Sequence, residues 1–133
     1  MAPRAILFET VRAMGLRLPN VEVATTYGSP ALKVRGSLLA CLASHKSAEP
    51  HTLVVRVGFE ARDELIAADP AVYYLTEHYV TSPVVLVRLS RIDRNALGDL
   101  LLSAWRFVTS ATGKRSLRPK RNRRIDRERS TQR

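Results

Sequence analysis

The chain has 133 residues, of which 45% are hydrophobic, 26% are charged and 6% are aromatic. This length fits one domain with a core of its own, and no apolar run approaches the roughly 18 residues that a membrane-spanning helix needs. The N-terminus lacks the pattern of a secretory signal, so we expect a cytoplasmic protein with no membrane partner. Its single cysteine, Cys41, excludes an internal disulfide and fits a reducing compartment.

The formal charge of +10 is concentrated near the C-terminus. Residues 114–133 hold ten Lys or Arg and two acidic residues, a net charge of +8, whereas residues 1–113 hold twelve basic and ten acidic residues, a net charge of +2. The C-terminal stretch has two sizeable apolar side chains and no aromatic one, too little to offset the entropy cost of ordering it. We therefore expect a folded domain over residues 1–110 and a basic disordered tail over residues 111–133.

The first half of the chain predicts one helix followed by strands. Apolar residues at spacings of four, three and four form the stripe of an amphipathic helix and predict a helix over residues 3–15. Alternating apolar and polar residues separated by glycine-containing turns predict strands near residues 21–27, 32–35, 38–43 and 53–57. Gly36-Ser37 supplies a hairpin turn between the second and third strands, and residues 28–30 break the chain before them.

The second half predicts a helix, a strand and a further helix. Acidic residues at the start of residues 60–68 suit a helix N-terminus, residues 76–82 are irregular, and residues 84–89 form a clear strand. Asp93 is a good N-cap for the final helix, and Trp105 lies on the apolar stripe of that helix, so we expect its indole to be largely buried against the sheet. This order predicts an α+β domain whose antiparallel sheet is covered on one face by helices.

Several short motifs occur in a fixed order over residues 4–108. They are Leu18-Pro19, Tyr27-Gly28-Ser29-Pro30-Ala31-Leu32-Lys33-Val34, Asp69-Pro70, Thr76-Glu77-His78-Tyr79, Val85-Leu86-Val87-Arg88-Leu89 and Ala104-Trp105. In this order and spacing the chain resembles the MmcQ/YjbR family. The resemblance implies a single α+β domain of the CyaY-like (frataxin-like) fold and a DNA-binding role, and it does not extend past Gly113.

Four basic residues interrupt the apolar strands at alternating positions, namely Lys33, Arg35, Arg56 and Arg88. Because successive side chains of a strand point to opposite faces, we expect these four to leave the core together, with no acid at the equivalent positions. Such a basic face would position a phosphate backbone. The alternative is the ordinary wet face of a sheet that is covered on one side.

The tail is a second candidate for contact with nucleic acid. Clustered basic side chains bind any polyanion by releasing counterions, without reading its sequence; the alternative is that they only solubilise the chain. The tail residues predicted to contact nucleic acid are Lys114, Arg115, Arg118, Lys120, Arg121, Arg123 and Arg124. The predicted partner is DNA, and the expected state is a monomer or weak dimer.

The irregular stretch around His78-Tyr79 suggests a function of a different class. Loops that flank rigid strands commonly carry function, and these two side chains together with Tyr27 would line the pocket of a small-molecule-binding or enzymatic domain. The alternative is that they hold the turn onto the sheet by hydrogen bonds to the backbone.

Signals for metals, cofactors and catalysis are weak. The three histidines, His45, His51 and His78, do not have metal-ligand spacing. Frataxin-like folds raise the question of iron, but Glu9 is the only acid of the first predicted helix and faces two arginines. A nucleophile elbow and a Gly-rich phosphate loop are both missing. The sequence therefore predicts no metal, no cofactor and no catalytic residue, and it favours a binding protein over an enzyme.

Overall fold

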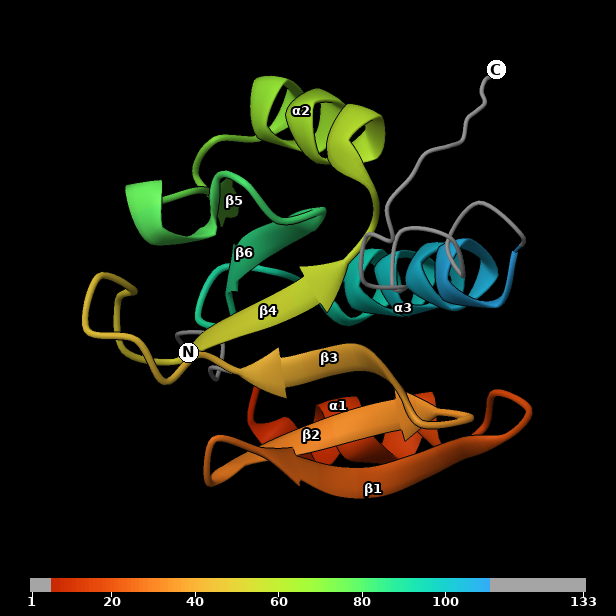
Figure 1. Ribbon diagram of the computed structural model, residues 1–133. Coiled ribbons are helices and arrows are strands. Elements are labelled where there is room, and N and C mark those ends of the chain that lie inside the picture. The colour runs from red at the N-terminus through yellow and green to blue at the C-terminus, as the bar shows by residue number, and fades with distance from the viewer. Residues whose placement is uncertain (1–5, 111–133) are drawn as a thin grey trace, which may run out of the picture.

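The structure, a computed structural model, describes residues 6–110, which form three α-helices and six strands (Figure 1). The helices are α1 (Phe8–Gly15), α2 (Phe59–Ala68) and α3 (Arg94–Thr109), with a short 3₁₀ helix η1 (Glu77–Tyr79). The strands are β1 (Val21–Thr26), β2 (Ser29–Val34), β3 (Ser37–Leu42), β4 (Thr52–Arg56), β5 (Tyr73–Tyr74) and β6 (Val84–Arg88). The tail expected over residues 111–133 and residues 3–5 of the helix expected over residues 3–15 lie outside the described residues. Residues 6–7, expected in that helix, precede it, because α1 begins at Phe8.

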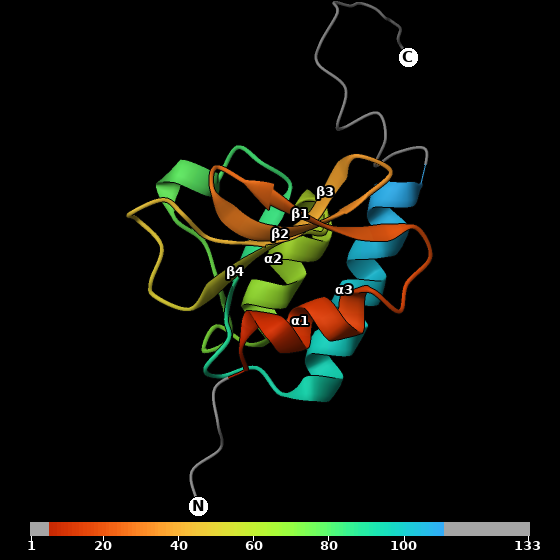
Figure 2. The same ribbon diagram turned by 90° about the horizontal axis from the view of Figure 1, so that it is seen from below.

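The strands form one sheet in the order β1-β2-β3-β4-β6-β5, and every neighbouring pair is antiparallel. All three α-helices lie on the same side of it (Figure 2). Helix α3 packs against β2, β3 and β4, α1 packs against β2, and α2 packs against β5 and β6. The prediction of an α+β domain with an antiparallel sheet covered on one face by helices is therefore confirmed. No helix within the described range is long and apolar enough to cross a membrane.

Two-residue turns, Tyr27-Gly28 and Arg35-Gly36, join β1 to β2 and β2 to β3. Their φ angles are 51° and 79° in the first turn and 52° and 83° in the second. Positive values at both positions define the type I′ turn, whose twist matches that of the flanking strands. Two expectations are corrected. Arg35 lies in a turn and not in a strand, and residues 29–30, expected as a break, begin β2.

The main core lies between the sheet and the helices. Its largest fully buried side chains are leucines from four strands or strand ends and from α3, namely Leu32, Leu39, Leu53, Leu89, Leu97 and Leu101. Helix α1 approaches the sheet closely because its last residue is Gly15. A Cβ at that position would lie 2.4 Å from Leu32 Cδ1, so a larger residue would require the buried Leu32 side chain or the helix to shift.

Helix α3 begins at the predicted cap, where the Asp93 carboxylate accepts a hydrogen bond from the Ala96 N–H at 2.7 Å. Trp105 packs against the main core, as expected, with part of its side chain exposed. Ala104 faces the core, and a step of one residue turns the next side chain by about 100° around the helix. The indole therefore lies at the edge of the main core. Its Nε1–H donates to the Pro19 carbonyl at 2.9 Å, which fastens the turn between α1 and β1.

The face of the sheet away from the helices, here called the open face, carries a second and smaller apolar cluster. A bulge in β3 shapes it, because the pairing between β2 and β3 skips Leu39. Side chains three residues apart in a regular strand point to opposite faces. With the extra residue between them, Leu38 and Cys41 both reach the open face.

Candidate ligand pocket on the open face of the sheet

The apolar cluster of the open face forms the floor of a pocket. Strand alternation sends Val54 of β4 and Val84 of β6 to this face, and the bulge of β3 adds Leu38 and Cys41. Above these side chains lies a hollow of about 600 Å³.

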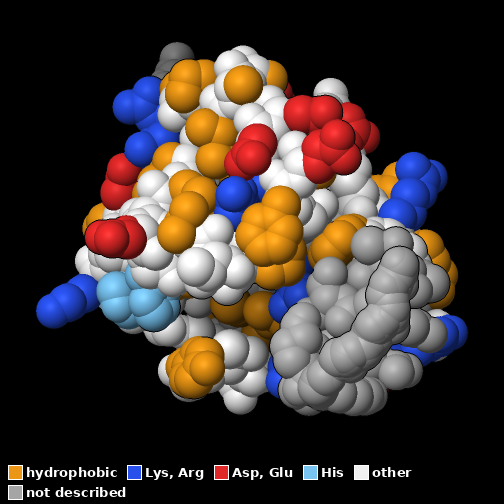
Figure 3. Space-filling view, turned by 45° about the horizontal axis from the view of Figure 1, so that its top comes forward, with side chains coloured by type: hydrophobic (Ala, Val, Ile, Leu, Met, Phe, Trp, Pro, Cys, Tyr) orange, Lys and Arg blue, Asp and Glu red, His pale blue; other side chains and the backbone are white. Residues whose placement is uncertain are grey.

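Polar groups from separate segments form the rim of the pocket. They come from the β1–β2 turn, from the loop after β3 and from the η1 segment, and they are Tyr27, Ser44, His45, His78, Tyr79 and Ser82. In the space-filling view, histidine side chains gather at one edge of a hollow whose base is hydrophobic (Figure 3). The structure thus brings Tyr27, His78 and Tyr79 to one pocket, as the sequence grouped them, and the tyrosine of the turn is 92% exposed.

Two histidines stack at this rim. The rings of His45 and His78 lie 3.5 Å apart between centroids and 7° from parallel, and Tyr79 meets the His78 ring edge-on at 4.7 Å. The Ser47 backbone N–H donates to His45 Nδ1 at 3.1 Å, so that nitrogen acts as an acceptor. Desolvation, followed by the nearby His78 and Lys46, lowers the pKa of His45, which favours its neutral form.

Arg56 is the one Lys or Arg among the described residues that line the pocket. It follows Val54 by two residues on β4 and therefore shares the open face. Its Nε is buried and has no hydrogen-bond partner among the described residues. Burial lowers the pKa of the guanidinium below its usual value, although arginine keeps its proton at any physiological pH. The guanidinium lines the pocket and takes part in neither ion pair of the described residues, so it is available to an anion that enters the pocket.

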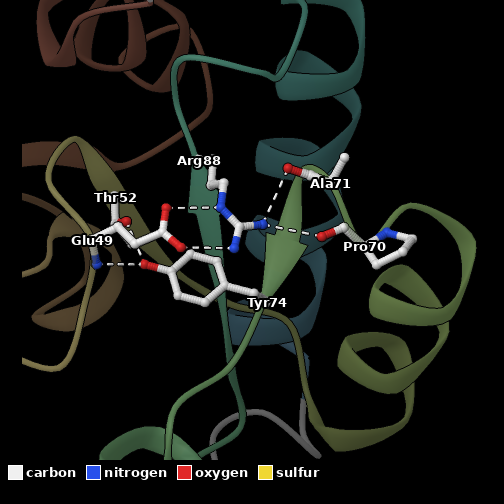
Figure 4. A network of polar contacts seen from close by, with 6 residues as sticks. All are labelled: Glu49, Thr52, Pro70, Ala71, Tyr74 and Arg88. Carbon is white, nitrogen blue, oxygen red and sulfur yellow. Dashed lines mark hydrogen bonds and ion pairs between the residues drawn. The ribbon is translucent and has the colours of Figure 1, made fainter.

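Arg88, on the same face, is fully engaged (Figure 4). Its Nε and Nη2 donate to the Glu49 carboxylate at 2.9 and 2.8 Å, and its Nη1 donates to the carbonyls of Pro70 and Ala71 at 3.0 and 3.1 Å. The guanidinium also lies over the Tyr74 ring, 4.2 Å from its centroid. The hydrogen bonds between the two charged groups lower the pKa of Glu49 and raise that of Arg88. This network fastens the loop before β4 to the β5–β6 edge.

The open face is therefore not uniformly basic. Lys33, Arg56 and Arg88 share it, but Glu22 stands opposite Lys33 in the β1–β2 register and Glu49 pairs with Arg88. The expectation that no acid occupies the equivalent positions is wrong. The nucleic-acid role of these basic residues stays a prediction. The tail residues predicted for the same role, which lie outside the described range, are Lys114, Arg115, Arg118, Lys120, Arg121, Arg123 and Arg124.

A buried arginine of α2 fixes the segment that leads from η1 into β6. Arg62 is 8% exposed, and its Nη1 donates to the carbonyls of Val80 and Ser82 at 2.9 and 3.3 Å. Its Nε donates to Asp63 at 3.0 Å, and its guanidinium lies 5.0 Å from the centroid of the Phe59 ring. Because Ser82 lines the pocket, this anchor on the helix side holds one wall of the pocket in place.

The titratable groups of the lining are a cysteine, two histidines, two tyrosines and an arginine. Burial raises the pKa of the Cys41 thiol to about 11, so the thiol is protonated and unreactive at neutral pH. No Asp or Glu occurs among the described lining residues, so the lining supplies no carboxylate to orient either histidine as a base. No group of three His, Cys, Asp or Glu side chains within residues 6–110 is arranged to hold a metal ion. The groups present suit an anion attached to an apolar body.

Sequence reasoning missed two features of this pocket. It treats His45 only as a histidine without metal-ligand spacing, whereas the fold stacks His45 on His78. It assigns Arg56 to a basic face, whereas the structure places this residue in the lining of a pocket, with its Nε buried. A charged residue between buried neighbours of a central strand is the signal that could have singled out Arg56.

No family model matches this chain. It is 43% identical over 54 residues to Uncharacterized protein Rv2570 of Mycobacterium tuberculosis (strain ATCC 25618 / H37Rv) and to Uncharacterized protein Mb2600 of Mycobacterium bovis. These matches cover 37% of this chain and 42% of each relative, less than half of the relatives' length. The chain is therefore similar, over part of its length, to proteins without an assigned function.

The crystal structure of Deinococcus radiodurans protein DR2400, described as a DUF419 domain, has a similar fold. Its TM-score is 0.65 at 20% sequence identity, and the match covers 84% of both chains. At this identity the likeness shows the fold alone, which is that of a small α+β domain. Membership of the MmcQ/YjbR family stays a prediction.

Proposed function

We propose that this domain is a binding module that takes a small molecule into the pocket at the His78-Tyr79 loop. The observation that carries the proposal is a hollow of about 600 Å³ with an apolar floor and a polar rim. Ligand sites in proteins are concave, mostly apolar and about 300–1,000 Å³ in volume, with a few convergent polar groups. The pocket has each of these properties.

The surroundings of the pocket support binding by a largely preformed site. Arg62 holds one wall through two backbone carbonyls, and Ser47 ties the loop that carries His45 to Thr76 through their hydroxyls at 2.8 Å. A site whose walls are fixed before binding loses less conformational entropy when a ligand arrives. The protonated thiol and the lack of a carboxylate in the described lining favour a binding protein over an enzyme.

A titration of the full chain with benzoate, benzamide and phenyl phosphate tests this proposal. We expect at least one of them to shift the backbone amide resonances of β3, β4 and the η1 segment in ¹H–¹⁵N spectra. Ser44→Trp, at an exposed position of the lining, should block the pocket and remove these shifts. Ser90→Trp, an equally exposed position after β6, is the matched control and should keep them. Shifts confined to the helix side, or unchanged in Ser44→Trp, contradict the proposal.

Nucleic-acid binding is the second candidate function, and the charge distribution favours it. Residues 114–133 carry a net charge of +8, which attracts any polyanion by counterion release. We propose that this stretch and the domain residues Lys33 and Arg35 all contact the phosphates of DNA. We also propose that the protein acts as a monomer or weak dimer. Residues 114–133 have no aromatic side chains to serve as stacking platforms for bases, and contacts to phosphates carry no sequence information, so we expect binding that is independent of sequence.

Gel retardation of duplex DNA at several salt concentrations tests this second candidate. If about five phosphates are contacted, log K should fall against log salt with a slope of roughly −4 to −5. Replacing the seven basic residues named for the tail by Gln should remove most of that slope. In this background, Lys33→Glu with Arg35→Glu should abolish the residual binding, whereas the control Arg91→Glu with Arg94→Glu should leave it. No retardation by the full chain at low salt contradicts the candidate.

A further inference from the structure

We infer that the pocket binds a small monocarboxylate with an apolar or ring-shaped body, whose carboxylate pairs with the Arg56 guanidinium. This inference rests on the proposed function as a small-molecule-binding module and names the class of its ligand.

The charges of the lining select an anion. Arg56 brings one permanent positive charge, and the described lining residues include no Asp or Glu to neutralise it. Among residues 6–110, neither of the two ion pairs involves this guanidinium. One unpaired cation in a partly desolvated site is matched by one negative charge, because a buried charge without a partner costs more free energy than a paired one.

The geometry of the guanidinium selects a carboxylate among anions. An arginine presents parallel N–H donors in a planar fork that matches the two oxygens of a carboxylate. Arg56 lines the pocket and makes no side-chain hydrogen bond or ion pair among the described residues; its Nε is buried, so the guanidinium nitrogens beyond it are the ones that a carboxylate would meet. A phosphate monoester carries close to two charges and three strong acceptor oxygens, and the described lining offers no second Lys or Arg to match them.

The floor and rim select the rest of the ligand. Beyond Arg56 the floor is apolar, with Cys41, Val54 and Val84 buried between the strands. The stacked pair of His45 and His78 adds flat ring surfaces at the edge. An apolar or aromatic body gains free energy from covering such surfaces at about 25 cal/mol per Å² buried. The ligand therefore combines a carboxylate head with a compact hydrophobic body.

The three probes of the titration separate this inference from the proposed function. Benzoate and benzamide have the same shape and differ in charge, and phenyl phosphate carries the larger charge on the same ring. With full chain at pH 7.5, we expect benzoate to bind at least about tenfold more tightly than benzamide, the factor that one charged hydrogen bond contributes. We expect phenyl phosphate to bind less tightly than benzoate.

Variants of Arg56 complete the experiment. Arg56→Met and Arg56→Gln should each lose about tenfold or more in benzoate affinity, whereas Arg106→Met, at an exposed position of α3, should stay within about twofold of the wild type. Circular dichroism checks that each variant is folded. Two substitutions of Arg56 are used so that the test still works if one of them does not fold.

Each outcome decides between the two claims. Equal binding of benzamide and benzoate in the pocket, or benzoate binding that survives both Arg56 variants, overturns the carboxylate inference and leaves the binding module standing. Tighter binding of phenyl phosphate also overturns it, in favour of a phosphate ligand. If none of the three probes binds in the pocket, both claims fall.

Discussion

Two arginines of the open face, Arg56 and Arg88, come from neighbouring strands and differ in whether their guanidinium groups have hydrogen-bond partners. In the β4–β6 register Arg56 stands opposite Val84 and Arg88 stands opposite Thr52, so they mark the two ends of one ladder. The Arg88 guanidinium meets a carboxylate, two carbonyls and an aromatic ring. Arg56 Nε is buried without a partner among the described residues. The same strand alternation produces both positions, so the difference lies in what covers them.

The Arg88 end is covered by segments that bind one another. The Tyr74 hydroxyl bonds to Thr52 Oγ1 at 2.6 Å and accepts from the Glu49 N–H at 2.8 Å, which joins β5 to the loop before β4. The Arg56 end is bordered instead by the rim of the pocket. One end of the ladder is a structural joint and the other is open to a ligand. Stability should therefore depend on Arg88, and ligand binding on Arg56.

The largest expected effect on stability is that of Arg88→Met. The substitution removes the donors to Glu49, Pro70 and Ala71 and should lower the free energy of unfolding by about 2 kcal/mol. Urea denaturation measures the loss, and Arg106→Met on the exposed side of α3 should change stability by less than about 0.5 kcal/mol. If Arg88→Met changes the free energy of unfolding as little as Arg106→Met does, the hydrogen bonds of Arg88 do not stabilise the domain.

Arg56→Met should leave stability within about 0.5 kcal/mol of the wild type, or raise it, since it replaces a buried donor without a partner by an apolar group. The same denaturation series measures this change. A loss as large as that of Arg88→Met would show that Arg56 is also a structural joint, and it would remove the contrast between the two ends.

The smallest expected effect is on the acid limb of stability. The Arg88 hydrogen bond holds the pKa of Glu49 below its usual value, so the unfolded state takes up this proton more readily than the folded state. The contribution is fully present above the usual glutamate pKa of about 4.3 and is lost as pH falls through the lower folded-state pKa. Glu49→Gln should flatten the fall of Tm below about pH 4.3. A fall as steep as that of the wild type contradicts the linkage.

The sequence predicts most of the fold because its patterns are local. Apolar alternation and glycine turns locate the sheet, and Asp93 marks the start of α3 within one residue. The resemblance to a family of α+β domains points to the same class. The sequence places Trp105 against the core but does not show its hydrogen-bond partner, because the Pro19 carbonyl is 86 residues away in the chain.

The pocket could be predicted only in part. Tyr27, His78 and Tyr79 lie where turn and loop signals put them, and all three line it. The bulge at Leu39 leaves no mark in an unbroken apolar run, so the floor that it creates is invisible in the sequence. Whether the Arg56 guanidinium has a partner depends on which loop covers its end of the β4–β6 ladder. The position of that loop is determined by contacts between residues far apart in the chain.

The Nε–H resonances of the two arginines test whether Arg56 contacts a ligand while Arg88 serves only the structure. In ¹H–¹⁵N spectra of the full chain, the signals are assigned by their absence in Arg56→Met and Arg88→Met and then followed during a benzoate titration. We expect the Arg56 Nε–H signal to shift as benzoate binds, because a carboxylate arrives at the same guanidinium, while the Arg88 signal stays in place. An Arg56 signal that does not move while benzoate occupies the pocket, or an Arg88 signal that moves as much, would contradict it.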